Sequence, residues 1–457
     1  MKRTAILNVV GLTRSLIGEA TPGIQRFLEK ASLQTVRPAF PAVTCTAQST
    51  YLTGLSATEH GAVGNGWYDR DYNELRFWKQ SNKLVQGEKL WETLRAQEPS
   101  FTCAKLFWWY NMYSSAEYTI TPRPLYPADG RKVFDIHTQP MELREAIKAE
   151  LGEFPFPFFW GPMAGIRSSE WIAASAGWTE EQYQPDLNLV YLPHLDYNLQ
   201  RLGPNASEVK EDLREIDRVV SELIDFYTAR DVQVILLSEY GITEVDQPVH
   251  LNRIFCEAGW LQIKNELGLE HLDFGGSKAF ALADHQVAHI YVNDASILNQ
   301  VRSTLEQTSG VEKVLGPEEK RSLGVDHARA GDLIAVAKPK AWFTYYYWMD
   351  DRLAPDFARC VDIHRKAGYD PVELFVDPSI AIPKLKIGGL LARKKLGFRT
   401  LMDVIPLDAN LVRGSHGRIP EDPDDWPVLI VPESIESSNE PLEATEVHRA
   451  LLRAITR

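Results

Sequence analysis

Short, largely apolar runs bounded by polar or turn residues recur along the chain. The clearest are Ala5–Val10, Leu187–Leu192 and Val232–Leu237. Apolar runs of this length are typical of strands that are buried on both faces, as in a parallel sheet. The pattern therefore predicts a central sheet of mostly parallel strands.

Helical patterns lie between these runs, at Gly23–Ala31, Lys89–Ala96 and Ser207–Arg230. In the longest of them, apolar residues recur every three or four positions, which is typical of a helix with one buried face. Strands that alternate with helices indicate a doubly wound α/β fold, in which binding sites lie at the carboxyl ends of the strands.

The pattern changes after about residue 265. It predicts a strand, a helix and two further strands, at Ala288–Val292, Ala295–Gln307, Val311–Leu315 and Asp332–Ala337. We interpret this part as a small α+β insertion or cap. Residues 350–380, rich in Asp, Pro and Gly, are expected to form long functional loops. A last strand at Val428–Val431 and a closing helix at Glu443–Ile455 return the chain to the core.

Two unusual segments interrupt the second half of the chain. The aromatic run 342–348 is expected to form the hydrophobic core of the cap, or else a wall on which a ring of the substrate stacks. The basic segment Lys384–Arg399 is expected to be a solvated helix face, with binding of a polyanion or a membrane as the alternative. We divide the chain into a core over 1–265, a cap over 266–400 and a return to the core over 401–457.

Length and charge limit the class of protein. The chain has 457 residues and a net charge of −13, which argues against a broad nucleic-acid surface. No apolar run reaches transmembrane length, and the first one is too short for a signal peptide. Four scattered cysteines without a CxxC pair suit free thiols in a reducing compartment, so we expect a cytoplasmic protein. The oligomeric state stays open.

A hydroxyl follows a proline-bracketed segment at Thr44, where a Ser/Thr-rich run with helical potential begins. Unpaired backbone N–H groups at the start of a helix bind phosphate well. Thr44 is therefore a candidate nucleophile or anion-site residue. The alternative is that Thr44 or Thr46 only caps the helix.

Polar residues follow three predicted strands. Asp196 comes after Leu187–Leu192, Glu239 and Tyr240 come after Val232–Leu237, and His416 comes after the short run Leu411-Val412-Arg413. Since the carboxyl ends of parallel strands meet at one edge of a sheet, we expect these side chains to converge with Thr44. Taken singly, each one is weak evidence, because an Asp after a strand is most often a helix cap and a lone His is most often structural.

A further cluster carries Asp362 and His364, whose spacing places both side chains on one face of an extended segment. They are candidates for a metal, and the neighbouring Arg365 or Lys366 for a phosphate. A charged surface loop is the alternative. His285 and His289 would share a face of the predicted strand, where a hydrogen-bonded structural role is the alternative.

Three spaced motifs carry a resemblance to a known family. They are Phe40-Pro41-Ala42-Val43-Thr44 with Thr53-Gly54, His60-Gly61-Ala62 running to Asn65, and Gly414-Ser415-His416-Gly417. Together they resemble the alkaline phosphatase superfamily, in particular its nucleotide pyrophosphatase/phosphodiesterase and phosphonoacetate hydrolase branch. The resemblance implies a three-layer α/β sandwich with a mixed, mainly parallel sheet and a smaller cap. It also implies hydrolysis of a phosphate ester, diester or phosphonate of a small metabolite, through Thr44 and two metal ions.

The resemblance also implies a set of ligands. Asp196, Glu239 and His416 stand at metal positions of the family, with Asn8, Asp362 and His364 as further candidates. Candidate contacts for the substrate are Asn65, Tyr240, His285, Arg365 and Lys366. The metal would be Zn²⁺, with Mg²⁺ or Mn²⁺ as alternatives.

The sequence departs from the family pattern at several ligand positions. The family's Asp before a glycine is Val10, its His four residues after the Asp is Gln200, and its Asp-His pair is Glu239-Tyr240. An Asn three residues after the nucleophile is Ala47. One metal, two or none are therefore open. A non-catalytic relative that binds a phosphorylated or sugar-like metabolite, or a partner protein, is the alternative function.

Overall fold

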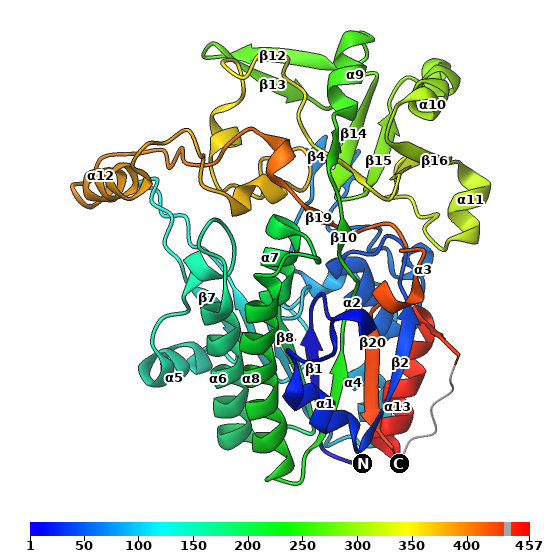
Figure 1. Cartoon of the computed structure of the whole chain (residues 1–457), viewed down its shortest axis with the longest axis vertical. Coiled ribbons are helices and arrows are strands. Elements are labelled where there is room, and N and C mark those ends of the chain that lie inside the picture. Colours follow the sequence, from blue (N-terminus) through cyan, green and yellow to red (C-terminus); the bar gives the residue numbers. More distant parts are fainter. Residues whose placement is uncertain (434–439) are drawn as a thin grey trace.

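A mixed nine-stranded sheet forms the core of this computed structural model, which describes residues 1–433 and 440–457 (Figure 1). The strand order is β21-β2-β20-β9-β1-β8-β5-β6-β7. β9, β1, β8, β5 and β6 run parallel, whereas β20 is antiparallel to both β9 and β2, and β7 is antiparallel to β6. The strands span Thr4–Val9 (β1), Ala31–Arg37 (β2), Cys103–Leu106 (β5), Tyr118–Pro122 (β6), Ile136–Gln139 (β7), Leu187–Leu192 (β8), Gln233–Leu237 (β9), Val428–Pro432 (β20) and Leu442–Glu443 (β21).

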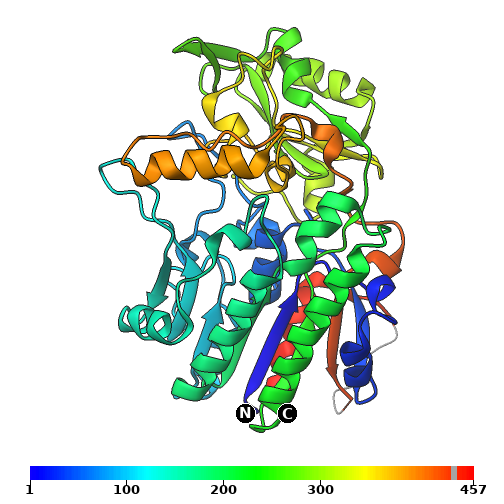
Figure 2. The same ribbon diagram turned by 60° about the vertical axis from the view of Figure 1, so that its left-hand side comes forward.

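Helices cover both faces of this sheet, as the expected three-layer architecture requires (Figures 1 and 2). One face carries α1 (Pro22–Leu28), α6 (Ile166–Tyr183), α7 (His194–Leu202) and α8 (Val209–Thr228). The other carries α2 (Thr44–Thr53), α4 (Leu90–Gln97) and α13 (Val447–Thr456). In α8, apolar residues such as Leu213, Ile216 and Val220 are buried, which explains the period seen in its sequence.

A second body rests above the carboxyl ends of the parallel strands (Figure 1). Its centre is an antiparallel sheet in the order β14-β15-β17-β16. These strands span Ala279–Asp284 (β14), Val287–Val292 (β15), Val311–Leu315 (β16) and Leu333–Ala337 (β17). The helices around it are α9 (Leu251–Glu257), α10 (Leu298–Gln307) and α11 (Pro317–Ser322), and a ribbon adds β12 (Gln262–Glu266) and β13 (Leu269–Asp273). We call this body the cap.

The chain enters and leaves the cap side by side. β10 (Thr243–Glu244) pairs antiparallel with β19 (Gly414–Ser415), and β11 (Gln247–Val249) pairs parallel with β18 (Ala341–Phe343). This two-stranded connection brings Tyr240 and His416, which flank it on the core side, to the boundary between core and cap. The division of the chain at residues 265 and 400 stays a prediction.

Smaller elements complete the fold. They are a short helix α3 (Ala57–His60), a hairpin β3 (Tyr68–Asp69) and β4 (Glu74–Leu75), a helix α5 (Glu142–Leu151) beside β7, and α12 (Pro383–Lys395). Figure 2 shows α12 stretched over the gap between core and cap. None of its residues is buried, as expected for a solvated basic helix. Within the described residues, every helix is too short or too polar to cross a membrane.

One expectation needs correction, and the structure decides between the two alternatives left open for the aromatic run. Leu411-Val412-Arg413 is not a buried strand, because Leu411 ends a short 3-10 helix and only Gly414–Ser415 forms a strand. The aromatic run 342–348 is buried in a cluster with residues such as Val245 and Phe357, and none of its rings lines the pocket described below. It is therefore core of the cap rather than a wall for a substrate.

Candidate active site

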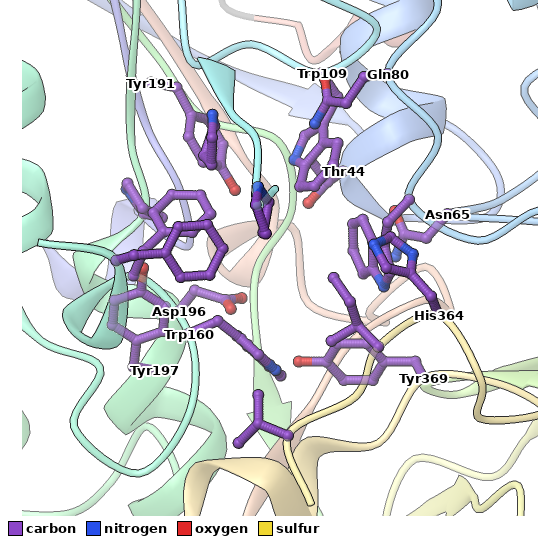
Figure 3. A pocket seen from close by; sticks show the side chains of 18 of the residues that line it. Thr44, Asn65, Gln80, Trp109, Trp160, Tyr191, Asp196, Tyr197, His364 and Tyr369 are labelled. Carbon is purple, nitrogen blue, oxygen red and sulfur yellow. The ribbon is translucent and has the colours of Figure 1, made fainter. Parts of the chain in front are cut away.

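A pocket of about 360 Å³ lies at the carboxyl ends of the parallel strands, where the core meets the cap. The core contributes Thr44, Tyr191, Asp196 and Tyr240, and loops beside β6 and α6 contribute a largely aromatic wall. The cap closes the pocket with His285 and the segment around Tyr369. Figure 3 shows Thr44, Tyr191, Asp196 and Tyr369 arranged around a common space. The pocket therefore lies at the edge of the sheet where the sequence predicted that Thr44, Asp196 and Tyr240 would converge.

Thr44 is the first residue of α2 and carries the hydroxyl that faces this pocket. The residue before the helix is Val43, which has no capping hydroxyl, so Thr44 is not a helix cap. Thr46 is not a cap either, because its hydroxyl donates to the carbonyl of Ala62 at 2.9 Å. The Thr44 hydroxyl lies 3.1 Å from the hydroxyl of Tyr240.

Tyr240 connects Thr44 to Asp196. Its hydroxyl donates to Asp196 Oδ1 at 3.1 Å. Since a phenol has a single hydrogen, the Thr44 hydroxyl must act as the donor to the Tyr240 oxygen. The second carboxyl oxygen, Asp196 Oδ2, accepts from the side-chain amide of Gln200 at 2.8 Å, and Gln200 Oε1 accepts from Tyr369 at 2.9 Å. Burial raises the pKa of Asp196 to about 7, against the two hydrogen bonds that favour the carboxylate.

Four aromatic rings stack beside this chain of hydrogen bonds. Tyr240 lies on His416 with a centroid distance of 3.7 Å and an angle of 6°, and His416 meets His285 at 3.7 Å. His285 stacks in turn on Tyr369 at 3.7 Å. Since the first two rings come from the core side and the last two from the cap, the stack crosses the boundary between them. Tyr240 and Tyr369, the end members of the stack, both take part in the chain of hydrogen bonds as well.

Glu239 lies behind Thr44 and is fully buried. Its Oε1 accepts from the side-chain amides of Asn8 and Gln48, both at 2.5 Å. Oε2 has no hydrogen-bond partner among the described atoms. Burial dominates and raises the pKa of Glu239 to about 8.

Asn65 fixes the start of α2 from the cap side. Its Oδ1 accepts from the backbone N–H of Cys45 at 3.1 Å, and its own N–H and amide donate to the two oxygens of Asp284 at 2.8 and 3.1 Å. Asp284 ends β14, and His285 sits in the hairpin turn that follows. The turn rests on the Gly-Ser-His-Gly segment, where Gln286 N–H donates to the His416 carbonyl at 2.8 Å. The retained motif therefore holds the cap in place.

The family's two-metal centre does not fit the side chains present here. Val10 is buried apolar core and offers no ligand atom. Gln200 and Tyr240 occupy ligand positions of the family but donate hydrogen bonds to Asp196 instead. His416 Nδ1 is engaged with the Ala42 carbonyl at 2.7 Å, and its Nε2 lies 3.9 Å from Asp196 Oδ1. This leaves one imidazole and one carboxylate together, whereas a zinc site takes three or four protein ligands.

One other group in the described part of the chain brings three potential ligands within 4.8 Å of one another. It consists of His194, Asp212 and Glu215, none of which lines the pocket. His194 Nε2 lies 3.4 Å from Asp212 Oδ1 and 3.1 Å from Glu215 Oε2. Asp196 and His416 also come this close, at 3.9 Å, but together with Glu239 they do not form such a group of three, so the structure does not gather the three predicted ligands.

The predicted phosphate contacts Arg365 and Lys366 lie outside the pocket lining. Arg365 is exposed and pairs with Asp362 at 3.2 Å. Lys366 is only 1% exposed and lies 2.7 Å from both Asp370 and Glu373. Both lysine and arginine are thus already neutralised by carboxylates of their own segment. Of the predicted Asp-x-His pair, His364 lines the pocket and Asp362 does not.

His289 also plays a structural part. Its Nε2 donates to the Val63 carbonyl at 3.0 Å and its Nδ1 accepts from Gly331 N–H at 3.1 Å. It does not share a strand face with His285, because His285 lies in the turn with a φ of 63°.

Sequence reasoning missed the aromatic wall. Most of it comes from segments without periodic pattern, which contribute Trp78, Trp109, Phe156, Phe159 and Trp160, while β8 adds Tyr191 and α7 adds Tyr197. Two cationic side chains, Arg123 and Lys132, also line the pocket. The cluster Phe156-Pro157-Phe158-Phe159-Trp160 was the available signal, since so many aromatic residues next to prolines in a loop need a cavity or a core to cover them.

Residues 4–370 match the family model of type I phosphodiesterase / nucleotide pyrophosphatase. The chain is 26% identical over 282 residues to an uncharacterized pyrophosphatase/phosphodiesterase of Schizosaccharomyces pombe, which covers 59% of this chain and 48% of that protein. It is 24% identical over 230 residues to mouse ectonucleotide pyrophosphatase/phosphodiesterase family member 1, covering 48% of this chain and 21% of that protein. The match therefore spans about half of the first relative and about a fifth of the second.

Solved structures share the fold over almost the whole chain. Murine ectonucleotide pyrophosphatase / phosphodiesterase 5 in complex with AMP superimposes with a TM-score of 0.59 at 13% identity, covering 100% of this chain and 95% of that one. Phosphonoacetate hydrolase from Sinorhizobium meliloti in complex with phosphonoformate gives a TM-score of 0.61 at 13% identity, covering 99% and 96%. At this identity the likeness confirms the predicted fold and leaves the site to be argued from its own residues.

Proposed function

Because this chain belongs to the type I phosphodiesterase / nucleotide pyrophosphatase family, we propose that it hydrolyses a phosphate diester or phosphonate ester of a small metabolite. The observation that carries the proposal is the Thr44 hydroxyl, which faces the pocket at the start of α2 and donates to Tyr240. A nucleophilic hydroxyl needs a neighbouring group that takes its proton. Tyr240 and Asp196 supply such a route.

The reaction then proceeds through the side chains of the pocket. The bond from Thr44 Oγ to phosphorus forms, and the bond from phosphorus to the departing oxygen breaks. The Thr44 proton moves to the Tyr240 oxygen, while the Tyr240 proton moves to Asp196 Oδ1, along two contacts of 3.1 Å. The departing oxygen takes a proton from water, the resulting hydroxide attacks phosphorus, and the same route returns the proton to Thr44.

The rest of the pocket supports a ligand with both an anionic and an apolar part. Arg123 and Lys132 supply positive charge, and the aromatic wall supplies flat apolar surface. The two solved relatives bind AMP and phosphonoformate, both small molecules with a phosphorus-centred anion. A small phosphorylated metabolite is therefore the partner we propose. The cytoplasmic location also stays a proposal, which four free thiols support and cell fractionation would test.

A second candidate function is a non-catalytic receptor for such a metabolite. The observation that favours it is the replacement of metal ligands by neutral residues at Val10, Gln200 and Tyr240. In that case Thr44 and Asp196 would only hold the ligand. The two candidates differ in turnover and share the pocket.

Hydrolysis of bis-p-nitrophenyl phosphate and of p-nitrophenyl phenylphosphonate tests both candidates. We expect turnover by the native protein, loss in Thr44→Ala and partial retention in Thr44→Ser. The matched control is Thr46→Ala, two residues along the same helix, whose hydroxyl bonds Ala62 and does not line the pocket. A fully active Thr44→Ala variant would refute the nucleophile. Saturable binding of AMP or phosphonoformate without any turnover would instead select the receptor.

A further inference from the structure

We infer that this pocket holds its ligand without a divalent cation, because a hydrogen-bond network centred on Tyr240 takes the place of the family's metal centre. The inference concerns the site of the proposed function and rests on it for the residues that meet the ligand. Its test is a measurement of bound metal, which requires no turnover.

The first step in the argument is the position of the Tyr240 hydroxyl. It lies 3.1 Å from Thr44 Oγ and 3.1 Å from Asp196 Oδ1, so it bridges the proposed nucleophile and a carboxylate. In the family, both of these positions would contribute to holding metal ions, whereas here the tyrosine hydroxyl contacts both. The ring cannot swing aside freely, because it is fully packed against His416 at 3.7 Å and is only 2% exposed.

The second step concerns whether the Asp196 carboxylate is free to bind a cation. Both of its oxygens already accept a hydrogen bond, one from Tyr240 and one from Gln200. The Gln200 amide must present nitrogen to Asp196, since the reverse orientation would place two oxygens 2.8 Å apart. Its own oxygen is engaged by Tyr369 at 2.9 Å. The carboxylate is therefore satisfied by neutral donors.

The third step concerns Glu239, the other retained carboxylate. Two amides, from Asn8 and Gln48, donate to its Oε1 at 2.5 Å each. Gln48 is anchored in turn, because its Oε1 accepts from the Trp109 backbone N–H at 2.7 Å. The third partner that a metal would need on this side is Val10, which is apolar and fully buried. Amide hydrogens thus occupy Glu239 Oε1, and Oε2 alone has no hydrogen-bond partner among the described atoms.

The network has a consequence for the class of substrate. Without a divalent cation, the phosphoryl group meets the Asp196 carboxyl group, with Glu239 buried behind Thr44, and only Arg123 and Lys132 supply positive side chains in the lining. A singly charged diester is repelled less than a doubly charged monoester under these conditions. We therefore assign phosphodiesters or phosphonate monoesters with an apolar group, rather than phosphomonoesters, to this pocket.

The experiment measures bound Zn²⁺ and Mn²⁺ by elemental analysis after equilibrium dialysis. His194→Ala combined with Glu215→Gln removes the only other group of three ligands in the described residues and serves as the background for all variants. In this background we expect no stoichiometric metal. Adding Val10→Asp, Gln200→His, Glu239→Asp and Tyr240→His restores the family ligands, and we expect about one to two Zn²⁺ per chain.

Val10→Asp places a carboxyl in the core, so a second variant with only Gln200→His and Tyr240→His is measured alongside, together with circular dichroism as a check of folding. This double variant restores two imidazoles beside Asp196 and His416, and we expect about one Zn²⁺ per chain. Stoichiometric metal in the background protein that disappears in Asp196→Asn would overturn the inference. The same holds if neither ligand-restoring variant, when folded, gains metal.

Turnover separates this inference from the proposed function. Diester hydrolysis that persists in EDTA supports both, and a preference for bis-p-nitrophenyl phosphate over p-nitrophenyl phosphate supports the assigned substrate class. Absence of metal together with absence of turnover leaves the inference intact and refutes the hydrolase. Diester hydrolysis that EDTA abolishes and added Zn²⁺ restores refutes the inference and keeps the hydrolase.

Discussion

Replacing Lys366 by Met tests whether its buried ion pairs hold the cap loop in place. Lys366 is 1% exposed and its Nζ lies 2.7 Å from both Asp370 and Glu373, which are 3% and 1% exposed. The attraction of these carboxylates outweighs burial and raises the pKa of Lys366, so the side chain stays charged. Methionine fills a similar volume but leaves both carboxylates without their cation.

The expected loss of stability follows from the two carboxylates that Lys366→Met leaves buried without a cation. Removing one partner of a buried ion pair destabilises a protein by about 3–5 kcal/mol. Glu373 keeps two donors, the Trp160 indole at 2.6 Å and the Asp362 backbone N–H at 2.9 Å, so we expect the lower half of that range. The pKa of Glu373 is already raised by burial, and loss of Lys366 raises it further. Because the folded variant then holds the proton more tightly than the unfolded chain, its deficit shrinks as the pH falls from 8 to 5.

Guanidinium unfolding followed by tryptophan fluorescence measures the cost, with Trp160 as a reporter near the lost charge. The matched control is Arg365→Met, one residue earlier, whose guanidinium is 61% exposed and pairs with Asp362. Exposed pairs contribute about 0–1 kcal/mol, so the control is expected to unfold close to the native protein. Equal midpoints for the two variants, or a deficit of Lys366→Met that does not change with pH, would refute the reasoning.

Four further outcomes are expected. Turnover of a diester rises as the pH passes about 7, because burial raises the pKa of Asp196 to about 7 and only its carboxylate accepts the proton, as a pH–rate profile would show. Lys105→Met gains stability relative to the native protein as the pH falls from 10 to 7, by up to about 1.4 kcal/mol per pH unit in thermal unfolding, because burial lowers the pKa of the lysine to about 7 in the folded state only. Gly417→Ala destabilises the fold by more than about 1 kcal/mol, which thermal unfolding would show as a lower melting temperature, since the residue has a φ of 112° and a Cβ would lie 3.1 Å from Gln286 N. Arg123→Gln weakens binding of phosphonoformate several-fold at low salt and less at high salt, as calorimetry would show, because the positive charge in the pocket lining is lost.

The central strands were predictable because nothing but burial on both faces explains their composition. β8 matches its predicted bounds, β1 is shifted by one residue at each end, and β9 begins one residue later than predicted. β2 was missed, since Ser32, Gln34 and Thr35 interrupt its apolar residues in a strand with partly exposed positions. A run of apolar residues in the sequence indicates that a strand is buried. A strand near the edge of a sheet is buried on fewer sides, so its sequence shows this signal less clearly.

The site was predictable where motif and strand end coincide, at Thr44, Asp196 and His416. It was not predictable at Lys366, because a charged residue in a loop reads as exposed unless its partners are known. Asp370 and Glu373 are close in sequence, yet only the folded cap removes water from all of them. The roles of Gln200 and Tyr240 could not be predicted either. The sequence shows that a metal ligand of the family is replaced there, but it does not show the hydrogen bond that the new side chain donates to Asp196.

The four-ring stack also links the packing of the cap to the geometry at Thr44. His285 and Tyr369 lie on the cap side, whereas Tyr240 and His416 flank the β10–β19 connection on the core side. The hydrogen bond between Tyr369 and Gln200 crosses the same boundary. Together these contacts amount to about 1–3 kcal/mol. A substitution of His285 or Tyr369 on the cap side therefore alters the packing beside Tyr240, whose hydroxyl lies 3.1 Å from Thr44 Oγ.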